Sequence, residues 1–88
     1  MVSKKFIIKH PLGIHMKPSA FLINAIKELE SAVTIVANQK RVDAKSLMML
    51  IAACIKYGDE VEVICEGPEE DVAMERITTV IENNFESV

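Results

Sequence analysis

The chain is 88 residues long, a length that allows one small domain and leaves no room for a deep substrate pocket. Hydrophobic residues make up 50% and charged residues 26%, which excludes intrinsic disorder, because disorder requires low hydrophobicity and high net charge. The formal net charge of -3 does not favour nucleic acid as a partner. We therefore expect a single domain over residues 1–88, with any chemistry at its surface.

The sequence contains no signal for a membrane or a metal. No apolar stretch approaches the ~20 residues of a membrane-spanning helix, and the apolar run at 6–8 is too short for the core of a signal peptide. We therefore expect a cytoplasmic protein without membrane insertion. Cys54 and Cys65 form no CxxC motif and have no histidine at ligand spacing, so the sequence predicts two buried thiols and neither a metal site nor a cofactor.

Charge is distributed unevenly along the chain. Residues 1–27 contain five lysines and no acidic residue, whereas residues 59–88 contain ten acidic residues and one arginine. Two interpretations are open. The charged side chains cover solvated faces, or the lysines form a basic patch for an acidic or phosphorylated partner.

The first elements are predicted to be a strand, a loop and a helix. Residues 4–9 have the composition of a strand, with Phe6 and Ile8 on one face. The proline and glycine at 10–13 indicate a loop. A helix is expected over 16–29, because apolar residues recur there at steps of three and four. The expected buried stripe comprises Ala20, Leu22, Ile23, Ile26 and Leu29.

A hairpin and a second helix are predicted next. Residues 32–36 and 41–43 are expected to pair as strands, joined by a turn in which Asn38 takes a positive φ. A helix should follow with Ser46 as its N-cap, because this serine stands directly before an apolar run. We expect this helix to end near Tyr57-Gly58, with Gly58 as the residue that reverses the chain.

The remaining sequence predicts a strand and a third helix. Residues 60–66 alternate between apolar residues and mostly glutamates, which is typical of a half-buried antiparallel strand. The Gly-Pro-Glu-Glu-Asp sequence at 67–71 predicts a helix start, with acidic residues near the positive end of the helix dipole. The expected buried stripe is Ala73, Ile77, Val80 and Ile81. The order βαββαβα predicts a two-layer α+β fold, a four-stranded antiparallel sheet with the helices on one face.

The strongest candidate for chemistry is His15, which immediately precedes the first predicted helix. Unpaired backbone N–H groups and the helix dipole form an anion site at such a point, and Lys17 adds a cation. A neutral imidazole there can attack a phosphoryl group through a ring nitrogen, while the N–H groups and the lysine hold the phosphoryl oxygens. Taken alone, a histidine before a helix is more often an ordinary surface residue.

Two segments resemble a known family. Residues 13–20, Gly-Ile-His-Met-Lys-Pro-Ser-Ala, resemble the Gly-Leu-His-Ala-Arg-Pro-Ala active-site motif of HPr, the phosphocarrier of the bacterial sugar phosphotransferase system. Residues 43–48, Asp-Ala-Lys-Ser-Leu-Met, resemble that family's Asn-Ala-Lys-Ser-Ile-Met segment. The resemblance extends to chain length and element order, and it implies the family's open-faced β-sandwich.

The resemblance implies a phosphoryl carrier, which is not an enzyme that turns over alone. His15 would accept a phosphoryl group from phosphorylated Enzyme I and pass it to the A components of sugar permeases, and Lys17 would stabilise the phosphate. Ser46 matches a serine that an HPr kinase phosphorylates in some bacteria, giving a form that binds a catabolite-control regulator. The residues themselves leave Ser46 as either a plain helix cap or such a regulatory site.

The family's partner-docking positions are matched by Ala20, Leu47, Met48 and Ile51. At helical spacing some of these residues could equally belong to the core. We expect Leu47 and Met48 to be exposed, because an exposed methionine suits a surface that accepts several partners in turn. A transient carrier must expose its docking face, so we expect a monomer.

Several residues depart from the family pattern. Lys17 replaces an arginine, which keeps the charge but loses the planar bidentate fork. Met49 and Cys54 stand where glycines are common, and Leu12 stands where asparagine is common. Gln39 replaces a turn glycine and leaves Asn38 to carry the unusual backbone angle. These changes are compatible with a specialised paralogue.

Three hypotheses follow from the sequence. The favoured one is the phosphoryl carrier with His15 as acceptor. The alternatives are an HPr-like regulatory binding module controlled by Ser46 phosphorylation, with weak or no histidine transfer, and a small α+β domain that binds an unrelated ligand. His10 has no role in the family pattern, and it is either an ordinary loop residue or an auxiliary acid or base.

Overall fold

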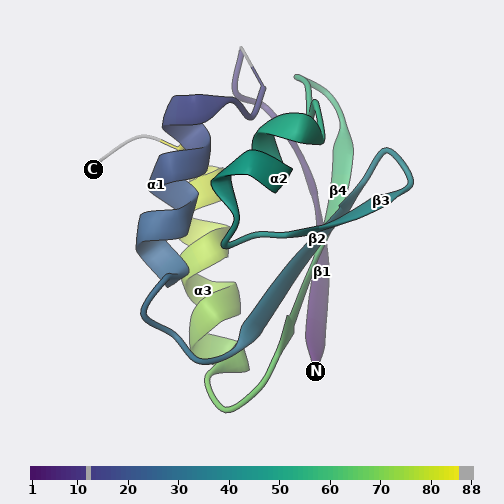
Figure 1. Cartoon of the computed structure of the whole chain (residues 1–88). Coiled ribbons are helices and arrows are strands. Elements are labelled where there is room, and N and C mark those ends of the chain that lie inside the picture. Colours follow the sequence, from purple (N-terminus) through teal and green to yellow (C-terminus); the bar gives the residue numbers. More distant parts are fainter. Residues whose placement is uncertain (12, 86–88) are drawn as a thin grey trace.

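The computed structural model describes residues 1–11 and 13–85, so Leu12 lies outside the described residues. Figure 1 shows all three helices on one side of the sheet. No helix in the described part of the chain is long and apolar enough to cross a membrane. The elements follow the predicted βαββαβα order: β1 (Val2–Ile7), α1 (Met16–Ile26), β2 (Ala32–Ala37), β3 (Lys40–Asp43), α2 (Leu47–Ala52), β4 (Glu60–Glu66) and α3 (Glu70–Glu82).

The four strands form one antiparallel sheet in the order β1-β4-β2-β3. Val63 of β4 pairs with Lys4 of β1 on one side and with Ile35 of β2 on the other. On the opposite face of the sheet, Lys5 stands directly across from Glu62. Opposite charges at such positions attract one another. One lysine of the basic N-terminal segment is thus placed opposite one glutamate of the acidic C-terminal segment.

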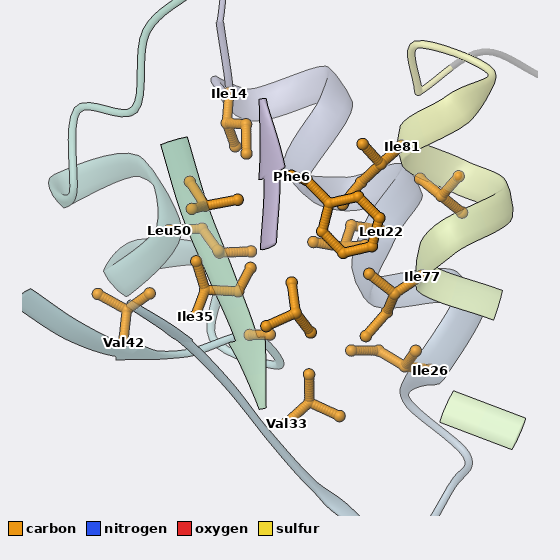
Figure 2. Packing of buried hydrophobic residues seen from close by; sticks show 14 of the residues in the cluster. Phe6, Ile14, Leu22, Ile26, Val33, Ile35, Val42, Leu50, Ile77 and Ile81 are labelled. Atoms are coloured by element: carbon orange, nitrogen blue, oxygen red, sulfur yellow. The ribbon is translucent and has the colours of Figure 1, made fainter. Parts of the chain in front are cut away.

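The hydrophobic core lies between the sheet and the helices. Figure 2 shows side chains from all three helices converging on those of the strands. Leu22 of α1, Leu50 of α2 and Ile77 of α3 are fully buried. The stripe predicted for α3 is confirmed in full: Ala73, Ile77, Val80 and Ile81 are its buried residues. The two-layer α+β fold predicted from the sequence is confirmed.

The first helix is shorter than predicted and presents a different face to the core. It ends at Ile26, and Leu29 is buried in the turn that follows. Ala20, which the periodicity placed in the buried stripe, is exposed. The prediction was wrong here because Ser19, a polar residue, occupies a place in the stripe. The buried residues of α1 are Pro18, Ser19, Leu22 and Ile26.

The second helix ends at Ala52, well before the predicted end near Gly58. Cys54 has a φ of 54°, in the left-handed region, and this reverses the chain after the helix. Ile55 then enters the core, and its carbonyl accepts the N–H of Ile14 at 2.9 Å. A longer helix would prevent this contact. Gly58 lies instead in the turn before β4.

Two further local predictions are corrected by the structure. Cys54 is exposed rather than buried, because it follows the last turn of α2 at the surface, whereas Cys65 on β4 is buried as predicted. Gln39 shares the left-handed conformation with Asn38, with φ values of 65° and 53°. Two consecutive positive φ values are those of a type I′ turn, which joins β2 to β3. Asn38 therefore does not carry the unusual angle alone.

Candidate functional site

The loop between β1 and α1 places His15 at the start of the first helix. The N–H of Gly13 donates to the His10 carbonyl at 2.9 Å, and the N–H of Ile14 donates to the Ile55 carbonyl at 2.9 Å. Gly13 has a φ of +70°, and a Cβ there would lie 2.4 Å from the Ile55 oxygen, so a glycine is required. With Ile14 fixed in the core, His15 follows as the N-cap residue of α1.

The first turn of α1 provides unpaired donors beside His15. The N–H of Ser19 bonds back to the His15 carbonyl at 2.9 Å, and Pro18 has no N–H. Met16 and Lys17 precede them, so their N–H groups have no acceptor inside the helix and point beyond its N-terminus. Together with the helix dipole they form a site for an anion. The side chain of Lys17 is exposed at this turn.

The His15 side chain is partly buried. Nε2 is buried and has no hydrogen-bond partner among the described residues. The His10 ring stands edge-on to the His15 ring, with 5.7 Å between centroids and an interplanar angle of 70°. Phe85 lies against His10 in the same manner, at 6.1 Å and 75°.

Ser46 is the N-cap of α2, as predicted. Its Oγ accepts the N–H of Met49 at 3.3 Å. Asp43 fixes the backbone before this cap. Its carboxylate accepts the N–H of Lys45 at 2.9 Å, and its carbonyl accepts the N–H of Ser46 at 3.0 Å. The serine is partly exposed, so its hydroxyl lies near the surface at the start of the helix.

The predicted docking residues lie at the surface of α1 and α2, which pack against each other. Met48 is 82% exposed and Leu47 is 37% exposed, which confirms the exposure predicted for these two residues. Ile51 is also 37% exposed. Ala20 is exposed on α1. Met16, at the first position of α1, is 64% exposed and was not among the predicted residues. Its place inside the motif was the signal that could have identified it.

His15 and Lys17 both lie at the start of α1, His15 as the N-cap and Lys17 in the first turn. The structure adds His10 and Phe85, which the sequence did not assign to the site. His10 lies in the loop that leads into the motif, which was a signal, but nothing in the sequence indicates that Phe85 reaches it. Within residues 1–11 and 13–85, no group of three or more His, Cys, Asp or Glu side chains could hold a metal ion.

Comparisons with known proteins identify the family. The family described as PTS HPr component phosphorylation site matches residues 2–83. The chain is 34% identical over 86 residues to the phosphocarrier protein HPr of Treponema pallidum (strain Nichols), with 98% of each chain covered. It is 33% identical over 82 residues to the HPr-like protein Crh of Halalkalibacterium halodurans, covering 93% of this chain and 98% of the relative. A solved HPr structure from Thermoanaerobacter tengcongensis has a TM-score of 0.92 at 27% identity, over 100% of both chains. The chain therefore belongs to the HPr family of the phosphotransferase system.

Proposed function

We propose that this protein carries phosphoryl groups in the bacterial sugar phosphotransferase system. It accepts a phosphoryl group on His15 from phosphorylated Enzyme I and passes it to sugar-specific A components. The observation that carries this proposal is the position of His15 as the N-cap of α1, beside the unpaired N–H groups of Met16 and Lys17. Membership of the HPr family supports the same class of activity.

The proposed transfer is a nucleophilic displacement at phosphorus. Nδ1 of His15 attacks, because Nε2 is buried, and the bond between phosphorus and the donor breaks as the new P–N bond forms. Negative charge on the phosphoryl oxygens is stabilised by the N–H groups of Met16 and Lys17, the dipole of α1 and the Lys17 ammonium. The same contacts hold the phosphoryl group on His15 until an acceptor docks.

Exposed apolar side chains on α1 and α2 form a surface that partners can contact near His15. We assign Ala20, Leu47, Met48 and Ile51 to docking, because they are exposed on two helices that pack together. A methionine with 82% exposure adapts its side chain to partners of different shape. In this proposal the protein acts in the cytoplasm as a monomer, without a cofactor, and meets Enzyme I and each A component transiently.

A regulatory role is the second candidate, and the similarity to an HPr-like Crh protein favours it. In this role Ser46 is phosphorylated by an HPr kinase, and the product binds a catabolite-control regulator. Ser46 is partly exposed and its Oγ already accepts the N–H of Met49, so a phosphate on this oxygen would lie near the positive end of the helix dipole. Histidine transfer would then be weak or absent.

The intact-protein mass distinguishes the two roles. After incubation with phosphoenolpyruvate and Enzyme I, we expect a gain of one phosphoryl group that is lost in acid and is absent in His15→Ala. An ordinary HPr serves as the positive control for Enzyme I. If that control is phosphorylated and this protein is not, the carrier proposal is wrong. Incubation with HPr kinase and ATP, with Ser46→Ala as control, then tests the regulatory role.

A further inference from the structure

We propose that His10 is a positioning residue that orients the imidazole of His15, and that Phe85 holds His10 in place. The proposal rests on the proposed role of His15 as phosphoryl acceptor. It assigns a role to two residues that lie outside the two family motifs, one in the loop before α1 and one after α3.

Hydrogen bonds from the described residues do not fix the His15 ring. As the N-cap residue it makes no side-chain capping hydrogen bond, and its buried Nε2 has no partner in the described part of the chain. The ring packs against the His10 ring, at 5.7 Å between centroids and an interplanar angle of 70°. This edge-to-face arrangement lies within the range that aromatic rings favour. Packing against His10 is therefore what sets the orientation of the imidazole.

His10 is in turn held by Phe85. The Phe85 ring is 4% exposed and meets His10 at 6.1 Å, again edge-on. The row of rings Phe85, His10 and His15 therefore connects the end of α3 with the start of α1. A movement of Phe85 would be transmitted to the His15 ring through His10.

The backbone after α3 is bent to deliver Phe85 to this place. Asn84 and Phe85 both have left-handed backbones, with φ values of 53° and 60°. Their N–H groups donate to the carbonyls of Ile81 at 3.0 Å and Val80 at 2.8 Å, the hydrogen bonds of a Schellman motif. A left-handed phenylalanine is strained. Burial of its ring beside His10 offsets that strain and locks the end of α3 against the loop.

The orientation matters because the two imidazole nitrogens have different surroundings. A half-turn of the His15 ring would exchange Nδ1 with Cδ2 and Nε2 with Cε1, so the attacking nitrogen would move to the opposite edge of the ring. His10 disfavours that rotation by occupying the space beside the ring. The predicted effect is therefore on the transfer step. Binding of Enzyme I should change little, because His10 is not one of the exposed apolar residues of α1 and α2.

The test compares His10→Ala with His10→Phe, which keeps a ring but has no nitrogen. With Enzyme I as donor, we expect His10→Ala to lower kcat about tenfold with little change in KM, and His10→Phe to restore most of that loss. Phe85→Leu should lower kcat in the same direction by a smaller factor. Nitrogen-15 NMR of the unphosphorylated proteins should show shifted His15 ring signals in His10→Ala and near-normal signals in His10→Phe.

The NMR signals separate a failure of this proposal from a failure of the proposed function. They require no phosphotransfer, so they report the His15 orientation even if Enzyme I does not phosphorylate the protein. Unchanged His15 signals and kcat in His10→Ala would overturn the proposal. A His10→Phe variant as impaired as His10→Ala would also overturn it, because it would show that a His10 nitrogen acts instead of the ring. If His10→Ala does not fold, the His15 ring signals and kcat are measured in Phe85→Leu instead, and unchanged values there would overturn the proposal.

Discussion

At the scale of single residues, Lys17 is the departure from the family motif that bears most directly on the chemistry. It is exposed at the first turn of α1, and in the proposed function its ammonium stabilises a phosphoryl group on His15. We expect Lys17→Gln to slow phosphorylation by Enzyme I about tenfold without changing the free energy of unfolding, because it removes a cation from the transition state. Quench-flow kinetics measure the rate.

Lys17→Arg is the matched control for that variant. Arginine restores the planar fork that grips two phosphoryl oxygens, so its rate should equal or exceed that of the natural protein. A lower rate would show that the site is rebuilt around lysine. If Lys17→Gln left the rates of phosphoryl transfer from the donor and to the acceptor unchanged, the assignment of an anion site to the start of α1 would be wrong.

Ser19 is a polar residue in apolar surroundings. It is fully buried, and its Oγ has no hydrogen-bond partner among the described residues. A buried unpaired hydroxyl destabilises the fold, so we expect Ser19→Ala to raise the free energy of unfolding by about 1 kcal/mol in urea denaturation. The exposed Ser3→Ala should leave stability nearly unchanged. A loss of stability in Ser19→Ala would instead show that the hydroxyl has a partner, such as a buried water.

At the scale of elements, the end of α2 depends on one unusual residue. Cys54 adopts a φ of 54°, which costs a non-glycine residue free energy. We expect Cys54→Gly to raise the free energy of unfolding by about 1 kcal/mol in thermal denaturation. Ala52→Gly, at the last residue of α2, should instead lower it, because glycine adds freedom to the unfolded chain and relieves no positive φ there. If both glycine variants were destabilised, the strain assigned to position 54 would be refuted.

The same helix shows what the sequence could and could not predict. The N-cap role of Ser46 was predictable because it depends on residues within a few positions along the chain. The end of α2 was not, because a cysteine at position 54 does not have the conformational signature that a glycine would have. The reversal is enforced by a distant contact, the hydrogen bond from Ile14 to the Ile55 carbonyl. Periodicity placed the stripe of α3 correctly because that stripe contains apolar residues throughout.

At the scale of the whole molecule, the two cysteines report on different parts of the fold. Cys65 lies on β4 beneath the helices, where burial raises the pKa of its thiol and the Glu70 carboxylate raises it further. Cys54 is exposed. A thiol reagent should therefore modify Cys54 quickly, and Cys65 at the rate of global opening. Cys54→Ser should abolish the fast phase alone. Fast modification of both thiols would contradict the buried position of Cys65.

The candidate site combines residues from both ends of the chain, the loop before α1 and the end of α3. Local sequence was sufficient to predict that His15 and Lys17 share the start of one helix. It was not sufficient to predict the contact between His10 and Phe85, because that contact depends on how α3 ends and how the sheet aligns α3 with the loop before α1. Sequence patterns report contacts within an element more directly than contacts between the two ends of a chain.

The measurement that tests the carrier function most directly is a chase of the phosphorylated protein. The protein is phosphorylated by Enzyme I, separated from it, and mixed with a panel of sugar-specific A components while the intact masses are followed. We predict that the phosphoryl group leaves this protein and appears on at least one A component, with no transfer when His15→Ala is used. If the phosphoryl group instead stayed until it hydrolysed, whichever A component was present, the protein would not be a carrier.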